Sequence, residues 1–122
     1  VQAVLDWEMA TVGDPLMDLG TTLAYWAEAE DEDILKMFNL SYVPGNFTRR
    51  ELVDYYASRT GRDLSDFGFY YVFGLCKVAT IAQQIYQRFS LGYSKDPRFS
   101  VLNQVVEAAG RKATACIQTG QL

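Results

Sequence analysis

Carboxylates gather near the start of the sequence, around a short apolar stretch and the turn that follows it. Residues 1–5 are apolar and rich in β-branched side chains, which favours a buried strand, and Asp6 stands where that strand would end. Functional side chains are common at strand ends because the backbone there is rigid while the side chain faces a cleft. Asp6 by itself suits an ordinary turn residue as well as a functional carboxylate.

Two further carboxylates accompany a predicted helix start. Asp14 can accept a hydrogen bond from an N–H group of the first helical turn, and Pro15 at the first helical position forfeits no hydrogen bond. Asp18 follows one turn later. The sequence therefore predicts a strand, a turn and a capped helix, with acidic residues at both junctions.

Taken together, these residues resemble a known family. The segments Val4-Leu5-Asp6-Trp7-Glu8, Gly13-Asp14-Pro15-Leu16 and Asp18-Leu19 are similar to the signature of the aminoglycoside phosphotransferase family, which has the protein-kinase-like fold. The most similar variant is the acyl-CoA-dehydrogenase-associated type. The resemblance implies that Asp6 binds the Mg²⁺ that bridges the phosphates of ATP. It also implies that Asp14 is structural and that Asp18 supports the catalytic loop, and it assigns no role to Glu8.

Other parts of the family pattern are missing. The family's catalytic base and second metal ligand lie upstream, in a loop that reads His-Gly-Asp…Asn, and this sequence contains no histidine. The nucleotide-binding lobe with its strand lysine is absent as well. We therefore expect residues 1–122 to be one domain, a fragment from the C-terminal lobe of a phosphotransferase acting on a small-molecule hydroxyl. Mg²⁺ and ATP are implied for the complete parent, whereas this fragment should bind neither tightly and should be inactive alone.

An alternative interpretation is a non-catalytic helical module for binding or oligomerisation. The predicted helices would suit it, but it has no use for a leading strand that ends in Asp-Trp-Glu. The sequence assigns no substrate-binding residues under either interpretation.

Composition narrows the classes of function. The 122 residues are 49% hydrophobic and 14% aromatic, which indicates a globular chain. A net charge of −4 argues against a nucleic-acid partner. The lack of histidine excludes a Ser-His-Asp triad and histidine-ligated metal within this chain. Cys76 and Cys116 form no CxxC pair and are predicted to be buried free thiols in a reducing compartment, the cytoplasm.

The rest of the sequence predicts a mainly α-helical fold, the helical C-terminal lobe of a kinase-like protein with one short strand. Helices are expected over 15–27, 49–59, 65–91 and 97–118, with a short helical turn within 34–40. Thr48 and Glu51 form a capping-box pattern, and Gly61 is the expected stop. The helix over 65–91 is the most apolar and is predicted to be the central core helix, with Phe73 buried. Its continuous apolar run is too short to span a bilayer, so no membrane partner is expected.

Three local features carry alternatives, and the last helix has a predicted inward face. The acidic run from Glu28 to Asp33 is predicted to be a solvated helix end or loop, with a cation site as the alternative. Arg49 and Arg50 are predicted to face solvent, with a phosphate contact as the alternative. The aromatic row over 67–73 is assigned to core packing rather than to a ligand cage. The last helix should turn Phe99, Leu102, Val106, Ala109, Ala113 and Ile117 inward.

Assembly is predicted from the leading strand. Without an upstream strand to pair with, residues 1–5 would present unpaired backbone groups and an apolar face. Pairing with a second copy would satisfy both, so we expect self-association through this segment.

Overall fold

The computed structural model describes residues 2, 3, 5, 10 and 12–122, and within this part the chain is mainly helical, as predicted. The elements are α1 (Pro15–Tyr25), α2 (Asp33–Lys36), α3 (Arg49–Thr60), α4 (Phe67–Ser90), the 3₁₀ helix η2 (Pro97–Val101) and α5 (Leu102–Thr119). The described residues contain no strand. The strand predicted for residues 1–5 lies partly outside them, so the strand and the self-association inferred from it stay predictions.

The helix boundaries follow local signals in the sequence. Asp14 caps α1 through its side chain, and Pro15 occupies the first helical position. Thr48 and Glu51 form the predicted capping box at the start of α3. Gly61 and Gly120 end α3 and α5 in the left-handed conformation, with φ of 68° and 71°, which glycine adopts without steric cost. The start predictions at Asp14, Pro15 and Thr48 and the stop prediction at Gly61 are confirmed.

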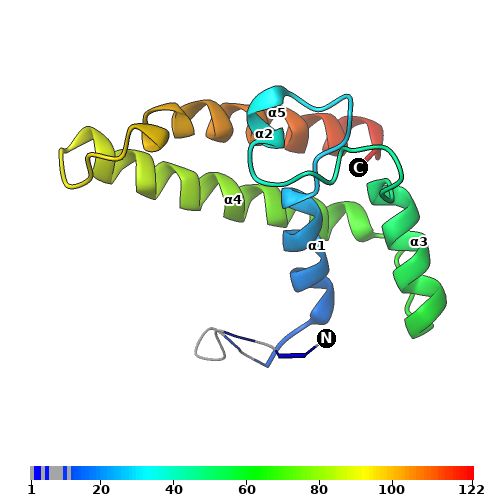
Figure 1. Ribbon diagram of the computed structural model, residues 1–122. Coiled ribbons are helices and arrows are strands. Elements are labelled where there is room, and N and C mark those ends of the chain that lie inside the picture. Colours follow the sequence, from blue (N-terminus) through cyan, green and yellow to red (C-terminus); the bar gives the residue numbers. More distant parts are fainter. Residues whose placement is uncertain (1, 4, 6–9, 11) are drawn as a thin grey trace.

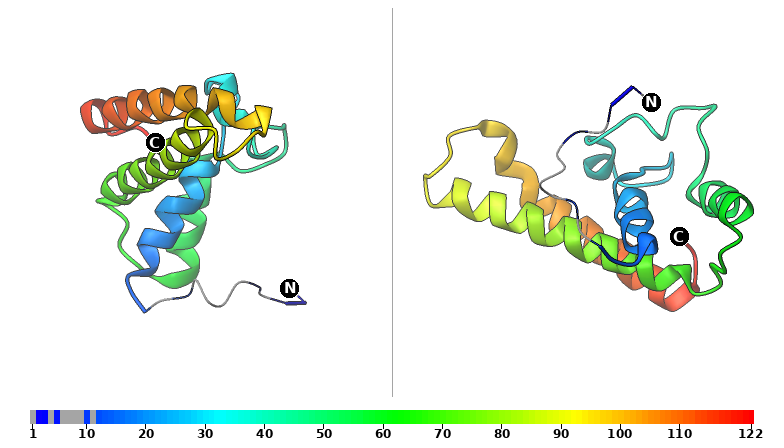
Figure 2. Two further views of the ribbon diagram at one scale, coloured as in Figure 1. Left: turned by 90° about the vertical axis from the view of Figure 1, so that its left-hand side faces the viewer. Right: turned by 90° about the horizontal axis from the view of Figure 1, so that it is seen from below.

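The long helix α4 is the centre of the fold, as predicted. It forms an antiparallel hairpin with α5, and α1 crosses it steeply from the other side (Figure 1). The left-hand view of Figure 2 shows α4 and α5 side by side, and the right-hand view shows α3 set apart beyond the start of α4. The buried core is drawn from α1, α4 and α5 together with Leu35 and Val53. Ala108, Ala109 and Ala113 on α5 are small enough to let the two hairpin helices approach closely.

Two glycines set the crossing of α1 and α4. A Cβ atom at Gly20 would lie 2.2 Å from the backbone oxygen of Tyr70, and one at Gly74 would lie 2.3 Å from the backbone oxygen of Gly20. The helices therefore touch backbone to backbone, at a separation that only glycine permits. Gly20 is unfavourable inside a helix by intrinsic propensity, but this contact requires it.

The buried face of α4 differs from the prediction for Phe73. That side chain is 40% exposed, so its assignment to the core is wrong. The buried face consists of Phe67, Tyr71, Gly74, Leu75, Val78 and Ala82. The first half of α4 is apolar around most of its circumference, so periodicity cannot select the face that α1 and α5 cover.

The inward face of α5 is partly as predicted. Leu102, Ala109 and Ala113 are buried, but Ile117 is 72% exposed and Cys116 takes the inner position. Each four-residue step turns a helix about 40° beyond a full turn. Two successive steps from Ala109 therefore carry Ile117 out of the interface.

The two cysteines differ in burial. Cys116 is buried as a free thiol, as predicted, whereas Cys76 is exposed on α4, which corrects the prediction for that residue. None of the helices in the described part of the chain is both long enough and apolar enough to cross a bilayer.

Candidate functional site

Part of the predicted site lies outside the described residues. Asp6, the predicted Mg²⁺ ligand, and Glu8 both fall there. The metal role of Asp6 therefore remains a prediction. The described part of the motif begins with Gly13 and Asp14 and continues into the first turns of α1.

Asp14 connects this motif to the central helix. Its Oδ1 accepts a hydrogen bond from the Leu16 amide at 3.0 Å, and its Oδ2 accepts one from the Tyr70 hydroxyl at 2.8 Å. The bond from the Leu16 amide and then the bond from Tyr70 lower the pKa of Asp14. The same contact raises the pKa of Tyr70. At neutral pH the pair is therefore an ionised carboxylate with a protonated phenol, the states in which the hydrogen bond is strong.

Sequence reasoning did not find Tyr70. It lies 56 positions beyond Asp14, inside a row of aromatic residues. Nothing in that row indicates that one hydroxyl group makes a specific hydrogen bond. The α1–α4 crossing brings the two residues together.

Asp18 lies in the first turn of α1 and is exposed. A negative charge there interacts favourably with the positive end of the helix dipole. Among the described residues, no three His, Cys, Asp or Glu side chains gather into a group able to hold a metal ion. Asp14 and Asp18 supply the hard oxygen atoms that Mg²⁺ prefers. However, both oxygens of Asp14 already accept hydrogen bonds, which fits the structural role that the family resemblance gives it.

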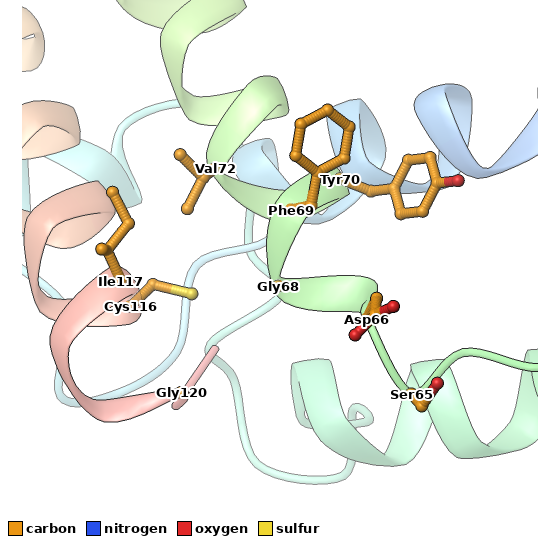
Figure 3. A pocket seen from close by; sticks show the side chains of 9 residues that line it. All are labelled: Ser65, Asp66, Gly68, Phe69, Tyr70, Val72, Cys116, Ile117 and Gly120. Atoms are coloured by element: carbon orange, nitrogen blue, oxygen red, sulfur yellow. The ribbon is translucent and has the colours of Figure 1, made fainter.

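A groove opens beside Tyr70, between the start of α4 and the end of α5 (Figure 3). Its volume is about 730 Å³, within the range of small-molecule sites. Phe69, Val72 and Ile117 give it an apolar surface, and Ser65 and Asp66 stand at its rim. The aromatic row is thus split: Phe67 and Tyr71 belong to the core, as predicted, whereas Phe69 is 66% exposed in the groove.

The acidic run forms a second polar cluster, and this corrects two predictions. Asp31 is buried and pairs with Arg49 and with Lys112 of α5, the latter at 2.6 Å. Glu28 pairs with Arg49 at 2.9 Å, and Glu32 pairs with Arg111 at 2.7 Å. The run is therefore not simply a solvated loop.

Arg49 is buried as well. Only 2% of it is exposed, so the prediction that it faces solvent is wrong, whereas Arg50 is exposed as predicted. Its guanidinium carbon lies 5.4 Å from the centre of the Tyr71 ring, a cation–π arrangement. Adjacent arginines in a first helical turn are normally solvated. Arg49 is buried instead, because the acidic run folds over the start of α3 and pairs with it.

The charges in this cluster compensate one another. Burial by itself would raise the pKa of Asp31, but hydrogen bonds from Arg49 and Lys112 outweigh burial and leave that pKa below its usual range. Burial raises the pKa of Tyr71. Paired carboxylates in such a setting hold segments together, and here they attach α3 and α5 to the loop after α1.

Comparison with known proteins places this geometry in context. The phosphotransferase enzyme family matches residues 1–53, the stretch that holds the motif, α1 and the start of α3. Over this stretch the chain is similar to members of that family. The match includes Asp6, Asp14 and Asp18, three of the four carboxylates in the family signature.

Similarity to curated proteins extends over most of the chain. Acyl-CoA dehydrogenase family member 11 of Mus musculus is 35% identical over 114 residues, which cover 86% of this chain and 14% of that protein. The Homo sapiens protein of the same name is 32% identical over 94 residues, covering 75% of the chain and 12% of the protein. Acyl-CoA dehydrogenase family member 10 of Mus musculus is 28% identical over 123 residues, which cover 93% of this chain and 11% of that protein.

The chain therefore spans 11–14% of the length of these curated relatives. No solved structure matches it significantly.

Proposed function

We propose that this chain is the helical, C-terminal part of an ATP- and Mg²⁺-dependent phosphotransferase that acts on a small-molecule hydroxyl group. The observation that carries the proposal is the match of residues 1–53 to the phosphotransferase enzyme family. The capped start of α1 at Asp14 and Pro15 supports it, because it agrees with the structural role of this motif position.

Three of the motif carboxylates have distinct proposed roles. Asp6 binds Mg²⁺, which neutralises charge on the ATP phosphates and orients them for transfer. Asp14 fixes the start of α1 with its two hydrogen bonds. Asp18 supports the catalytic loop of the complete enzyme. We place the complete enzyme in the cytoplasm. Its substrates would be ATP and a small molecule with a hydroxyl group.

The 122 residues alone are expected to be inactive. They contain no histidine and hence no His-Gly-Asp…Asn loop to supply the catalytic base and the second metal ligand. Phosphoryl transfer depends almost entirely on positioning and on electrostatic stabilisation of the phosphates, so a part that lacks these groups retains little rate enhancement.

The test compares Asp6→Asn with Asp33→Asn in the full-length product of the gene. Asparagine keeps the shape of the side chain but removes the charge that attracts Mg²⁺. We expect Asp6→Asn to lower the rate of phosphate transfer from ATP by about a hundredfold or more, because metal polarisation of phosphoryl oxygens contributes several kcal/mol. Asp33, whose side chain is 99% exposed, provides a matched loss of charge that should leave the rate unchanged.

Calorimetry with Mg·ATP completes the test. The full-length protein should bind Mg·ATP and the Asp6→Asn variant should bind it much more weakly, while the 122-residue chain should show no tight binding. Normal Mg²⁺-dependent turnover by Asp6→Asn would refute the metal role. No binding of Mg·ATP by the full-length protein would instead favour the helical module, for which the apolar groove beside Tyr70 would be the contact surface.

A further inference from the structure

One residue of α4 holds α1 at two points. The Tyr70 hydroxyl donates to Asp14 at 2.8 Å, and the backbone oxygen of the same residue lies against Gly20, where a Cβ would approach to 2.2 Å. The two contacts lie six positions apart along α1. The same residue of α4 therefore contacts both the start and the middle of α1.

The hydroxyl contact falls at the junction between helix and motif. Asp14 has an extended backbone with φ of −75° and ψ of 117°, and Pro15 after it has its φ fixed by the pyrrolidine ring. The direction in which the chain leaves the helix toward Gly13 therefore depends on how Asp14 is held. Both oxygens of its carboxylate are engaged, one by the Leu16 amide of its own helix and one by Tyr70.

The rings around Tyr70 hold its side chain in place. Its ring centre lies 6.0 Å from that of Phe67 in a stacked arrangement and 5.4 Å from that of Phe69 in an edge-to-face arrangement. Phe67 is buried in the core, so the hydroxyl is presented from a rigid base. Figure 3 shows the Tyr70 ring pointing away from the end of α5, with its hydroxyl toward α1.

From these contacts we propose that Tyr70 is a positioning residue for the phosphotransferase motif: it fixes Asp14 and thereby the direction in which the chain leaves α1 through Gly13, toward the part of the sequence that carries Asp6. The inference rests on the proposed function. Tyr70 touches no reacting group in this role and acts only through Asp14. A capped helix alone would not need it, because Thr48 caps α3 without a comparable side-chain contact from α4 among the described hydrogen bonds.

The first measurement is amide hydrogen exchange on the 122-residue chain and needs no activity. Tyr70→Phe removes the hydroxyl and keeps the ring. We expect the amide of Leu16 to exchange about three- to tenfold faster, the range for one hydrogen bond to a solvent-exposed charged group. The amide of Glu51, capped by Thr48 on α3, is an internal reference that should not change. Tyr93→Phe, at an exposed tyrosine beyond the end of α4, is the matched control.

A second variant separates the tertiary contact from the cap. Serine caps helices about as well as aspartate but is too short to reach the Tyr70 hydroxyl. Asp14→Ser should therefore give the same exchange pattern as Tyr70→Phe. In the double variant the Leu16 amide should exchange no faster than in either single variant. Additive effects would show that the two residues act separately, which would overturn the inference.

The third measurement uses the full-length protein. The Mg²⁺ concentration for half-maximal phosphate transfer should rise about three- to tenfold in Tyr70→Phe, in step with the exchange result, and should not change in Tyr93→Phe. Unchanged exchange at Leu16 would overturn the inference even if the protein is an active phosphotransferase. Faster exchange with unchanged Mg²⁺ dependence would also overturn it, since Tyr70 would then stabilise the helix without positioning the motif. Loss of the proposed function would appear separately, as no transfer by the unsubstituted protein.

Discussion

The glycine contact between α1 and α4 allows a quantitative test of the fold. In Gly20→Ala the new Cβ would lie 2.2 Å from the backbone oxygen of Tyr70 and 2.6 Å from its carbonyl carbon. Real Cβ atoms essentially never approach closer than 3.0 Å, so the helices must separate by at least 0.8 Å. No side-chain rotation can relieve the clash, because the opposing atoms belong to backbone.

The cost follows from that separation. A gap of about 0.5–1 Å forfeits a quarter to a half of the dispersion energy of each contact. Leu23, which is fully buried near this crossing, would lose part of its packing. Overpacking typically costs about 1–3 kcal/mol and lost packing adds to it, while the better helix propensity of alanine returns roughly 1 kcal/mol. If the lost packing about offsets the propensity gain, Gly20→Ala should lower the free energy of unfolding by about 1–3 kcal/mol.

Gly110→Ala is the matched control. Gly110 also lies inside a helix, α5, but nothing lies within 4 Å of a Cβ placed there. Only the propensity gain operates, so this variant should be more stable by about 0.5–1 kcal/mol. Gly74→Ala should resemble Gly20→Ala, and the double variant should cost less than the sum, because the first substitution already separates the helices.

Urea unfolding followed by far-ultraviolet circular dichroism gives the free energies and checks that the slope with denaturant is unchanged. Equal stabilities for Gly20→Ala and Gly110→Ala would refute the close crossing on which the placement of α1, and hence of Asp14 against Tyr70, depends.

Three further predictions concern the core and the buried charges. Asp31→Asn should destabilise the fold by about 3–5 kcal/mol in urea unfolding at neutral pH, because it leaves the buried Arg49 undercompensated. Asp33→Asn, at an exposed pair, should change stability by less than about 1 kcal/mol, and equal effects of the two would contradict the buried network. The folded-state pKa of Asp31 lies below the ordinary value of 3.8, so its stabilising contribution should be complete above that pH and lost as the pH falls further. The gap between the parent chain and Asp31→Asn should then narrow in acid, and a gap that widens would reverse the assigned sign. Leu75→Ala should cost about 2–5 kcal/mol and Phe73→Ala about 1 kcal/mol or less, because Leu75 is buried and Phe73 is 40% exposed; the reverse order in thermal melts would place the wrong face of α4 inward.

Much of the local structure was predictable from the sequence, because its signals act within a few residues. Asp14 with Pro15, Thr48 with Glu51, and the glycines at 61 and 120 set helix ends through contacts between near neighbours. The family signature was visible for the same reason, since its residues follow one another along the chain.

Which surface each helix buries was decided by the tertiary structure. Phe73 and Ile117 satisfy the apolar pattern of their helices, yet both are exposed because α1 and α5 cover other faces. Gly20 is unfavourable by propensity and is required only because another backbone lies against it.

Long-range pairing of polar groups was equally beyond the sequence. By themselves Glu28, Asp31 and Arg49 have the composition of a solvated surface, and only the fold of the acidic run against α3 and α5 buries and pairs them. Tyr70 meets Asp14 across 56 positions. The sequence alone determined the capped helix starts, the glycine stop at Gly61 and the family signature, because those depend on neighbouring residues. The tertiary structure decided which side chains are buried, paired or placed beside the motif, because those depend on how distant segments meet.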